Sequence, residues 1–192
     1  MIETLIQLDK AIFLFINGLH HPFVDLVMVF ISGKFTWIPF YLVLLILIIK
    51  HFKWETIKIL LFVALLIGLS DQISVRAFKL VFERLRPCHD PEIQHLVHLV
   101  TGSCGGSFGF VSSHAANSVA LSVFLFYLLK PYYRRIGWIL FIWAFFVGYS
   151  RIYLGVHYPT DIGVGGLLGM MLGWLVWQFY KLTTTWFCGK SC

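Results

Sequence analysis

The chain has 192 residues, of which 59% are hydrophobic and 12% are charged, with a mean hydropathy of +0.83 and a formal net charge of +6. Soluble domains carry about 25% charged residues, so this composition argues against a soluble enzyme, a disordered chain and a nucleic-acid binder. Lipid is the expected solvent, and the length suits one membrane-embedded domain over residues 1–192.

The first 33 residues predict two short amphipathic helices at the membrane interface. Residues 2–16 place Leu5, Leu8, Ile12 and Phe15 at helical spacing, which is typical of a helix lying in the interface. His20-His21-Pro22 then breaks the chain, and residues 23–32 predict a second apolar helix that either lies on the membrane or inserts partway. The acids near the N-terminus argue against a cleavable signal peptide.

Five uncharged stretches follow and predict an all-α transmembrane bundle of five or six spans, with its core over residues 35–182. A full span needs about 20 helical residues, so we expect the second helix to run from about Thr56 to beyond Lys79. The uncharged stretches are residues 35–49, 59–70, 114–129, 136–150 and 162–180.

The connections between these stretches divide the charges into two groups. One side has eight basic residues and one acid, Glu55, and the positive-inside rule makes that side and the C-terminus cytoplasmic. The other side has seven basic residues and eight acids, and with five spans it includes the N-terminus. The basic residues of the cytoplasmic side are Lys50, Lys53, Lys58, Lys130, Arg134, Arg135, Lys181 and Lys190.

Gly165, Gly169 and Gly173 stand four residues apart in the last stretch and therefore share one helix face. Small residues let helices approach closely in lipid. We interpret this face as packing within the chain, with a homodimer contact as the alternative.

Residues that bind anions or move protons gather in the two longest outer connections. Lys79, Arg84 and Arg86 precede Pro87, which predicts a basic helix end at the membrane surface. A cluster that snorkels to lipid headgroups is the alternative interpretation. The glycine-rich residues 105–110 then lead into Ser112-Ser113-His114, and a helix start of this kind binds phosphate through its free N–H groups.

The second outer connection contains Arg151, His157 and Asp161. A carboxylate on one ring nitrogen of a histidine fixes its tautomer and leaves the other nitrogen free as a nucleophile or base. A buried His–Asp pair can also be purely structural, but an arginine beside it at a membrane mouth favours function.

Together the clusters resemble the three signature motifs of the type 2 phosphatidic acid phosphatase (PAP2) superfamily, which includes bacterial membrane lipid phosphatases. Val111 and Ser113 depart from the Pro and Gly of the second motif, and an amphipathic N-terminus stands where many members have a first span. The matching residues are Lys79, Arg86 and Pro87, then Ser112 and His114, then Ser150, Arg151, His157 and Asp161.

The resemblance implies a role for each matching residue. His157 would attack phosphorus, Asp161 would orient it, and His114 would protonate the leaving oxygen. Neither a metal nor another cofactor is implied. The groups implied to bind the phosphate oxygens are Lys79, Arg86, Arg151 and Ser112, with the N–H groups of Ser113 and His114.

Other polar residues carry separate expectations. Arg84 contacts either the substrate or the headgroup region, and Asp71, an acid within a span, pairs with Arg76 or Lys79. Cys88 and Cys104 share the outer loop, and we consider a disulfide between them. His89, His95 and His98 fit no standard zinc spacing, so a solvated loop is favoured there over a metal site.

The predicted function is an integral-membrane lipid phosphatase of the bacterial cell (inner) membrane, with its site on the periplasmic or extracellular side. Candidate substrates are undecaprenyl diphosphate, lipid A phosphates, phosphatidylglycerol phosphate and phosphatidic acid. A vanadate haloperoxidase-like enzyme and a non-catalytic lipid-binding or transport protein are the alternatives.

Overall fold

A computed structural model describes residues 2–188, and no strand occurs among them. The order of the elements confirms the predicted all-α class. The α-helices are α1 (Ile2–Gly18), α2 (Pro22–Ser32), α3 (Ile38–Phe52), α4 (Glu55–Ile73), α5 (Leu80–Phe82), α6 (Ser113–Leu129), α7 (Ile136–Tyr153) and α8 (Pro159–Cys188).

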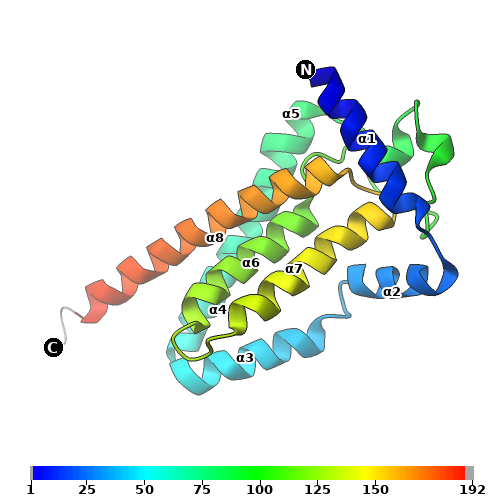
Figure 1. The fold of residues 1–192 in the computed structure, drawn as a ribbon. Helices are drawn as coiled ribbons and strands as arrows, with labels where there is room; N and C mark the ends of the chain where they lie inside the picture. The colour runs from blue at the N-terminus through cyan, green and yellow to red at the C-terminus, as the bar shows by residue number, and fades with distance from the viewer. Residues whose placement is uncertain (1, 189–192) are drawn as a thin grey trace.

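Helix α6 is the centre of the bundle, because it packs against α4, α7 and α8. Figure 1 shows these four helices running side by side, with α1 across the end where α7 finishes and α8 begins. Leu66, Phe124, Leu129 and Leu140 are among the fully buried residues of this core. The end of the bundle where α7 finishes and α8 begins is called the site end below.

Helix α4 continues into α5 through a π-helical segment, Ser74–Lys79, to form one apolar helix of 28 residues over Glu55–Phe82. This confirms the prediction of a helix that passes Lys79. The helix ends at Glu83, whose φ of 45° lies in the left-handed region. It therefore stops four residues before Pro87, which the sequence predicted as the breaker.

Four of the predicted stretches lie wholly within helices and residues 35–49 lie mostly in α3, after a turn at residues 35–37, but the lengths of the helices differ. Within the described chain, Glu55–Phe82, Ile136–Tyr153 and Pro159–Thr184 are long and apolar enough to cross a membrane. Helices α3 and α6 are apolar but shorter, with 15 and 17 residues. Helices α1 and α2 meet at 114° and add a fourth crossing if the bent pair counts as one span.

Helix α1 turns its apolar stripe away from the protein. Leu5 and Phe15 are 60% and 71% exposed, whereas Asp9 and Asn17 are buried on the other side. The Asn17 side chain donates to the main-chain oxygens of His98 and Tyr153, at 2.9 and 2.8 Å. The amphipathic helix therefore docks on the site end by the side that carries Asp9, Asn17 and the fully buried Phe13, and leaves its exposed apolar stripe for lipid.

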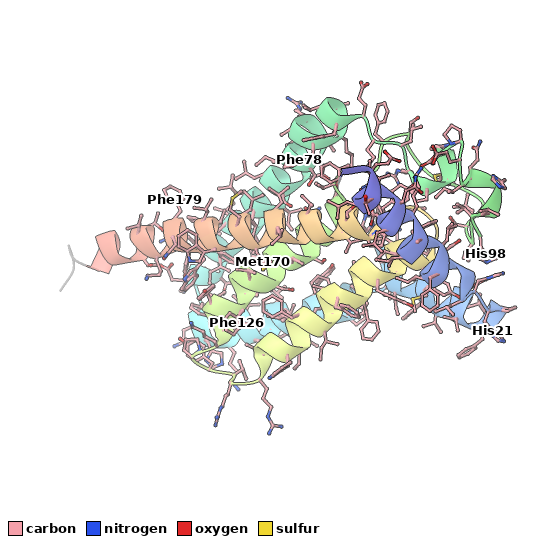
Figure 2. All side chains as sticks on the ribbon, turned by 45° about the horizontal axis from the view of Figure 1, so that its top comes forward. His21, Phe78, His98, Phe126, Met170 and Phe179 are labelled. Atoms are coloured by element: carbon pink, nitrogen blue, oxygen red, sulfur yellow. A yellow bond between two sulfur atoms is a disulfide. The ribbon has the colours of Figure 1, made fainter. Side chains whose placement is uncertain are left out.

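The outer surface of the bundle is apolar over most of its length. Figure 2 shows Met170 and Phe179 on the outside of the helices, and His21 and His98 at the site end, where nitrogen and oxygen atoms gather. Such exposed apolar area is expected where lipid is the solvent.

The glycine face of α8 packs against α6. A Cβ added at Gly165 would lie 2.7 Å from the main-chain oxygen of Ser112, and one at Gly169 or Gly173 would meet the backbone of Ala116 or Ala120. The face is thus filled within one chain, as the first interpretation predicts, and the homodimer alternative gains no support from it.

Candidate active site

The two helix starts that carry the site are tied together through the main chain. The Ser112 N–H donates to the carbonyl oxygen of Asp161 at 3.0 Å, which joins the start of α6 to the first turn of α8. Ser112 is also the N-cap of α6, where its hydroxyl accepts from the Ala115 N–H at 3.5 Å. The second and third sequence motifs therefore meet at the site end.

His157 and Asp161 face each other inside this junction. His157 Nδ1 lies 3.4 Å from Asp161 Oδ2, and the side chains are 2% and 0% exposed. The same carboxylate oxygen accepts from the Tyr158 N–H at 3.0 Å. The turn before His157 needs Gly155, whose φ is +83° and whose absent Cβ would meet the carbonyl oxygen of His98 at 3.0 Å.

The electrostatic surroundings keep His157 neutral near neutral pH. Burial, together with the nearby Arg86 and Arg151, lowers the pKa of His157 to about 4, although Asp161 acts in the opposite direction. A neutral imidazole with one nitrogen facing a carboxylate has the other nitrogen free to act as a nucleophile.

Arg86 is fixed by the loop that the disulfide closes. Cys88 and Cys104 are bonded, with Cα atoms 6.1 Å apart. The Arg86 guanidinium donates to the carbonyl oxygens of Phe108 and Cys104, at 3.2 and 3.0 Å. Gly105, with a φ of +76°, brings its backbone against the same guanidinium. Burial lowers the pKa of Arg86, while Asp161 raises it.

Arg151 and Arg86 both line a cavity of about 460 Å³ that also borders Gly105. One Arg151 Nη donates to the hydroxyl of Ser32, and its buried Nε has no hydrogen-bond partner within residues 2–188. An unpaired buried donor is costly, so a cationic cavity with such a donor is a suitable place for an anion.

Lys79 completes the cationic set from the π-helical segment. Its Nζ donates to the hydroxyl of Ser113 at 3.1 Å, so the residue that replaces glycine in the second motif holds a cation. His114 stands in the next position, near enough for electrostatic interaction with Arg151, His157 and Lys79.

His114 and Ser113 also border a second, larger cavity. This cavity of about 630 Å³ runs between α3, α4, α6 and α7, and its walls are mostly apolar. Lys34, Asp71 and Asn117 lie among its few polar lining residues. The cavity therefore connects the polar groups of the site end with an apolar space between the helices.

Two sequence expectations concern the contacts of charged residues. Arg84, expected at the substrate or the headgroup region, forms ion pairs with Asp9 and Asp161, at 2.6 and 3.0 Å. Asp71 was expected to pair with Arg76 or Lys79. It belongs to no ion pair in the described part of the chain, and the charge of Asp71 acts on Lys79 without contact.

Sequence reasoning missed Asp9, Ser32 and Lys34. Each comes from the N-terminal 34 residues and reaches the site end or its cavities. The one available signal was that Asp9, a carboxylate, lies opposite the apolar stripe of an amphipathic helix. That signal did not indicate which residue Asp9 would bind.

The metal alternative has no complete ligand set in the described residues. Ligand atoms of Cys88, His89 and Cys104 lie within 4.8 Å of one another, but both sulfurs belong to the disulfide. His98, another histidine of that loop, places its Nε2 3.0 Å from Asp25 Oδ2 instead.

Residues 58–184, about two thirds of the chain, match the sequence model of the PAP2 superfamily. The chain belongs to the PAP2 superfamily. A lipid A 4'-phosphatase of Bacteroides thetaiotaomicron is 40% identical over 95% of the chain and 82% of that protein. Another, from Porphyromonas gingivalis, is 34% identical over 99% and 80%.

The fold of this PAP2 protein is also similar to that of a solved relative. A transmembrane PAP2-type phosphatidylglycerolphosphate phosphatase from Bacillus subtilis superposes with a TM-score of 0.71, at 26% identity, over 93% of this chain and 87% of that one. The protein is therefore a membrane lipid phosphatase. The relatives that match most of the chain and are named phosphatases support this interpretation over a haloperoxidase or a non-catalytic transporter.

Proposed function

We propose that the protein removes a phosphate group from a lipid A-type glycolipid, through a phosphohistidine on His157, at the outer face of the bacterial cell membrane. The observation that carries the chemistry is the buried His157–Asp161 pair beside Arg86 and Arg151. The choice of lipid is supported by two relatives named lipid A 4'-phosphatase that match 95% and 99% of the chain.

The phosphate is held by cations and oriented N–H groups. A phosphate monoester carries close to two negative charges, and Arg86, Arg151 and Lys79 supply three positive ones in a partly buried setting. The N–H groups of Ser113 and His114, at the start of α6, and the Ser112 hydroxyl add donors. We propose that these groups do what a metal ion does in other phosphatases.

The reaction proceeds in two displacements. His157 Nε2 attacks phosphorus and the bond to the leaving oxygen breaks, while His114 gives that oxygen a proton. A water molecule then attacks the phosphohistidine, His114 takes back a proton, and inorganic phosphate leaves with His157 neutral. Asp161 fixes the tautomer and stabilises the positive charge that develops on the ring.

The large cavity suits the hydrophobic part of the substrate. Its apolar walls begin beside His114, so a lipid whose phosphate reaches His157 has an apolar space for its tail.

The outer location rests on the distribution of charge. The connections 53–54 and 130–135, which contain Lys53, Lys130, Arg134 and Arg135, lie at the end of the bundle opposite the site end. The positive-inside rule assigns such connections to the cytoplasm. Lys190, counted with them, lies outside the described residues.

The test is phosphate release by the purified protein in detergent from a panel of lipids. The panel holds lipid A, undecaprenyl diphosphate, phosphatidylglycerol phosphate and phosphatidic acid, with His157→Ala as the matched inactive control. We expect the highest kcat/KM for lipid A and no turnover by the control. A higher kcat/KM for any other lipid would reject the proposed substrate.

A further inference from the structure

Asp9 of α1 lies outside the residues that match the family model, yet it reaches the site end. Its side chain is 5% exposed. Its Oδ2 accepts from Arg84 Nη2 at 2.6 Å, and its Oδ1 accepts from the Thr160 N–H at 3.0 Å. The Thr160 hydroxyl donates to Asp9 as well. One carboxylate therefore binds both an arginine and the first turn of α8.

Arg84 carries this contact on to the site. Its other nitrogen, Nη1, donates to Asp161 Oδ1 at 3.0 Å, and its guanidinium stacks 4.2 Å from the ring centre of Tyr158. Asp161 Oδ2, the opposite oxygen of that carboxylate, faces His157. A continuous path of polar contacts thus runs from Asp9 through Arg84 and Asp161 to His157.

The charges along this path explain why a second carboxylate matters. Arg84 alone would neutralise Asp161 and weaken the support that Asp161 gives to a positive imidazole. With Asp9 on its other side, the arginine is shared between two carboxylates, and one negative charge remains next to His157. Interactions between charges at 3 Å are strong where water is excluded, as it is around Asp9 and Asp161.

We propose that Asp9 is a positioning residue of the phosphatase site, acting through Arg84 to fix the orientation and charge of Asp161. This inference rests on the proposed role of His157. On this proposal, the N-terminal helix contributes to catalysis and does not serve only as a membrane anchor.

The structure offers a matched control on the neighbouring residue of the same helix. Lys10 ties α1 to the outer loop through Asp90 and Glu92, at 2.8 and 2.6 Å, without touching Arg84. Lys10→Met therefore loosens the helix but leaves the hydrogen bonds among Asp9, Arg84 and Asp161 in place, and Asp90 still accepts from the Tyr158 hydroxyl. Asp9→Asn keeps an oxygen that can accept from the Thr160 N–H and removes only the charge.

The experiment measures kcat and KM for phosphate release from lipid A by the full-length protein and by Asp9→Asn, Lys10→Met, Arg84→Gln and the Asp9→Asn/Arg84→Gln double variant. We expect Asp9→Asn to lower kcat by about 10- to 100-fold. Losses of this size are typical when a metal-binding side chain loses the hydrogen-bond partner that orients it. The KM of Asp9→Asn should stay within about twofold of the parent value. The kcat of Lys10→Met should also stay within about twofold of the parent value. The double variant should lose no more than Arg84→Gln alone, because the two residues act in series.

Equal losses in Asp9→Asn and Lys10→Met would show that α1 only docks, and would overturn the proposal. Losses that multiply in the double variant would overturn it too, since Asp9 would then act independently of Arg84. Melting temperatures of all the variants separate these results from unfolding. An active parent, an inactive His157→Ala and a fully active Asp9→Asn would refute this inference alone. An inactive parent or an active His157→Ala would refute the proposed function as well.

Discussion

The main-chain N–H of Ser112 and the main-chain oxygen of Asp161 are joined by a hydrogen bond of 3.0 Å. This bond connects the start of α6, which we propose binds phosphate, to the residue whose carboxylate faces His157. Residues 49 positions apart in the sequence are thereby held next to each other. Preorganised geometry of this kind is what phosphoryl transfer requires, because positioning and electrostatics supply most of the catalysis.

His114→Ala tests the general acid. We expect kcat for a lipid phosphate monoester to fall by about 10²- to 10⁴-fold, the usual contribution of a positioned acid. The loss should be smaller for undecaprenyl diphosphate, because a phosphate leaving group needs less help from a proton. Rates on the two substrates check this, and an equal loss on both would contradict the assignment.

The acid limb of the pH profile tests the state of His157. Its pKa is lowered to about 4, so the nucleophile stays neutral down to far below the ordinary value of 6.5. After correction for ionisation of the substrate phosphate, kcat/KM should therefore rise with pH through about 4, and a fall at higher pH should report loss of the proton that His114 gives to the leaving oxygen. An acid limb near 6.5 would mean that the buried environment does not control His157.

The same pKa predicts a loss of stability in acid. The unfolded chain binds a proton on His157 below about pH 6.5, whereas the folded chain does not until about pH 4. The free energy of unfolding should therefore fall as the pH drops from 6.5 towards 4. In His157→Gln the free energy of unfolding should fall less steeply over the same range. Thermal melting of both forms in detergent at several pH values measures the difference.

The disulfide is expected to hold Arg86 in place. Its cysteines are separated by 16 residues, and a loop of about that length stabilises a protein by roughly 3 kcal/mol. Cys88→Ser with Cys104→Ser should lower the melting temperature and raise KM, because the Cys104 carbonyl binds the Arg86 guanidinium. A lower melting temperature with an unchanged KM would contradict this prediction. It would show that the disulfide stabilises the fold without affecting phosphate binding.

Two glycines of α8 give opposite predictions for one substitution. A Cβ at Gly163 meets no atom within 4 Å, so Gly163→Ala should stabilise the helix by about 0.5–1 kcal/mol. A Cβ at Gly169 meets the backbone of Ala116 and Ala120 in α6, so Gly169→Ala should destabilise the fold. Melting temperatures compare the pair, and equal shifts would contradict the packing of α6 against α8.

Much of this arrangement could be predicted from the sequence, because it depends on local spacing. The helix expected over residues 136–150 is Ile136–Tyr153, and the break at Pro22 starts α2. The motif residues Lys79, Arg86, Arg151 and His157 gather at one end because their spacing places each at a helix end or in an adjoining turn.

The parts that could not be predicted depend on how distant segments meet. Asp9 lies beside Thr160 only because α1 docks by the side that carries Asp9 and Phe13, and the exposed apolar stripe of α1 gives no register for that contact. Arg84 likewise has a basic neighbour two residues away, and nothing in the sequence says which of the two binds Asp161. The early end of α5 follows from the left-handed conformation of Glu83, which the position of Pro87 does not specify.

The central claim is that His157 carries the phosphoryl group during turnover. The most direct measurement mixes the protein with lipid A labelled in its phosphate, quenches within one turnover in alkaline denaturant and sequences the labelled peptide by mass spectrometry. We predict one phosphoryl group, on His157, that is absent in His157→Ala. Label on another residue, or full turnover with no labelled enzyme, would contradict the account.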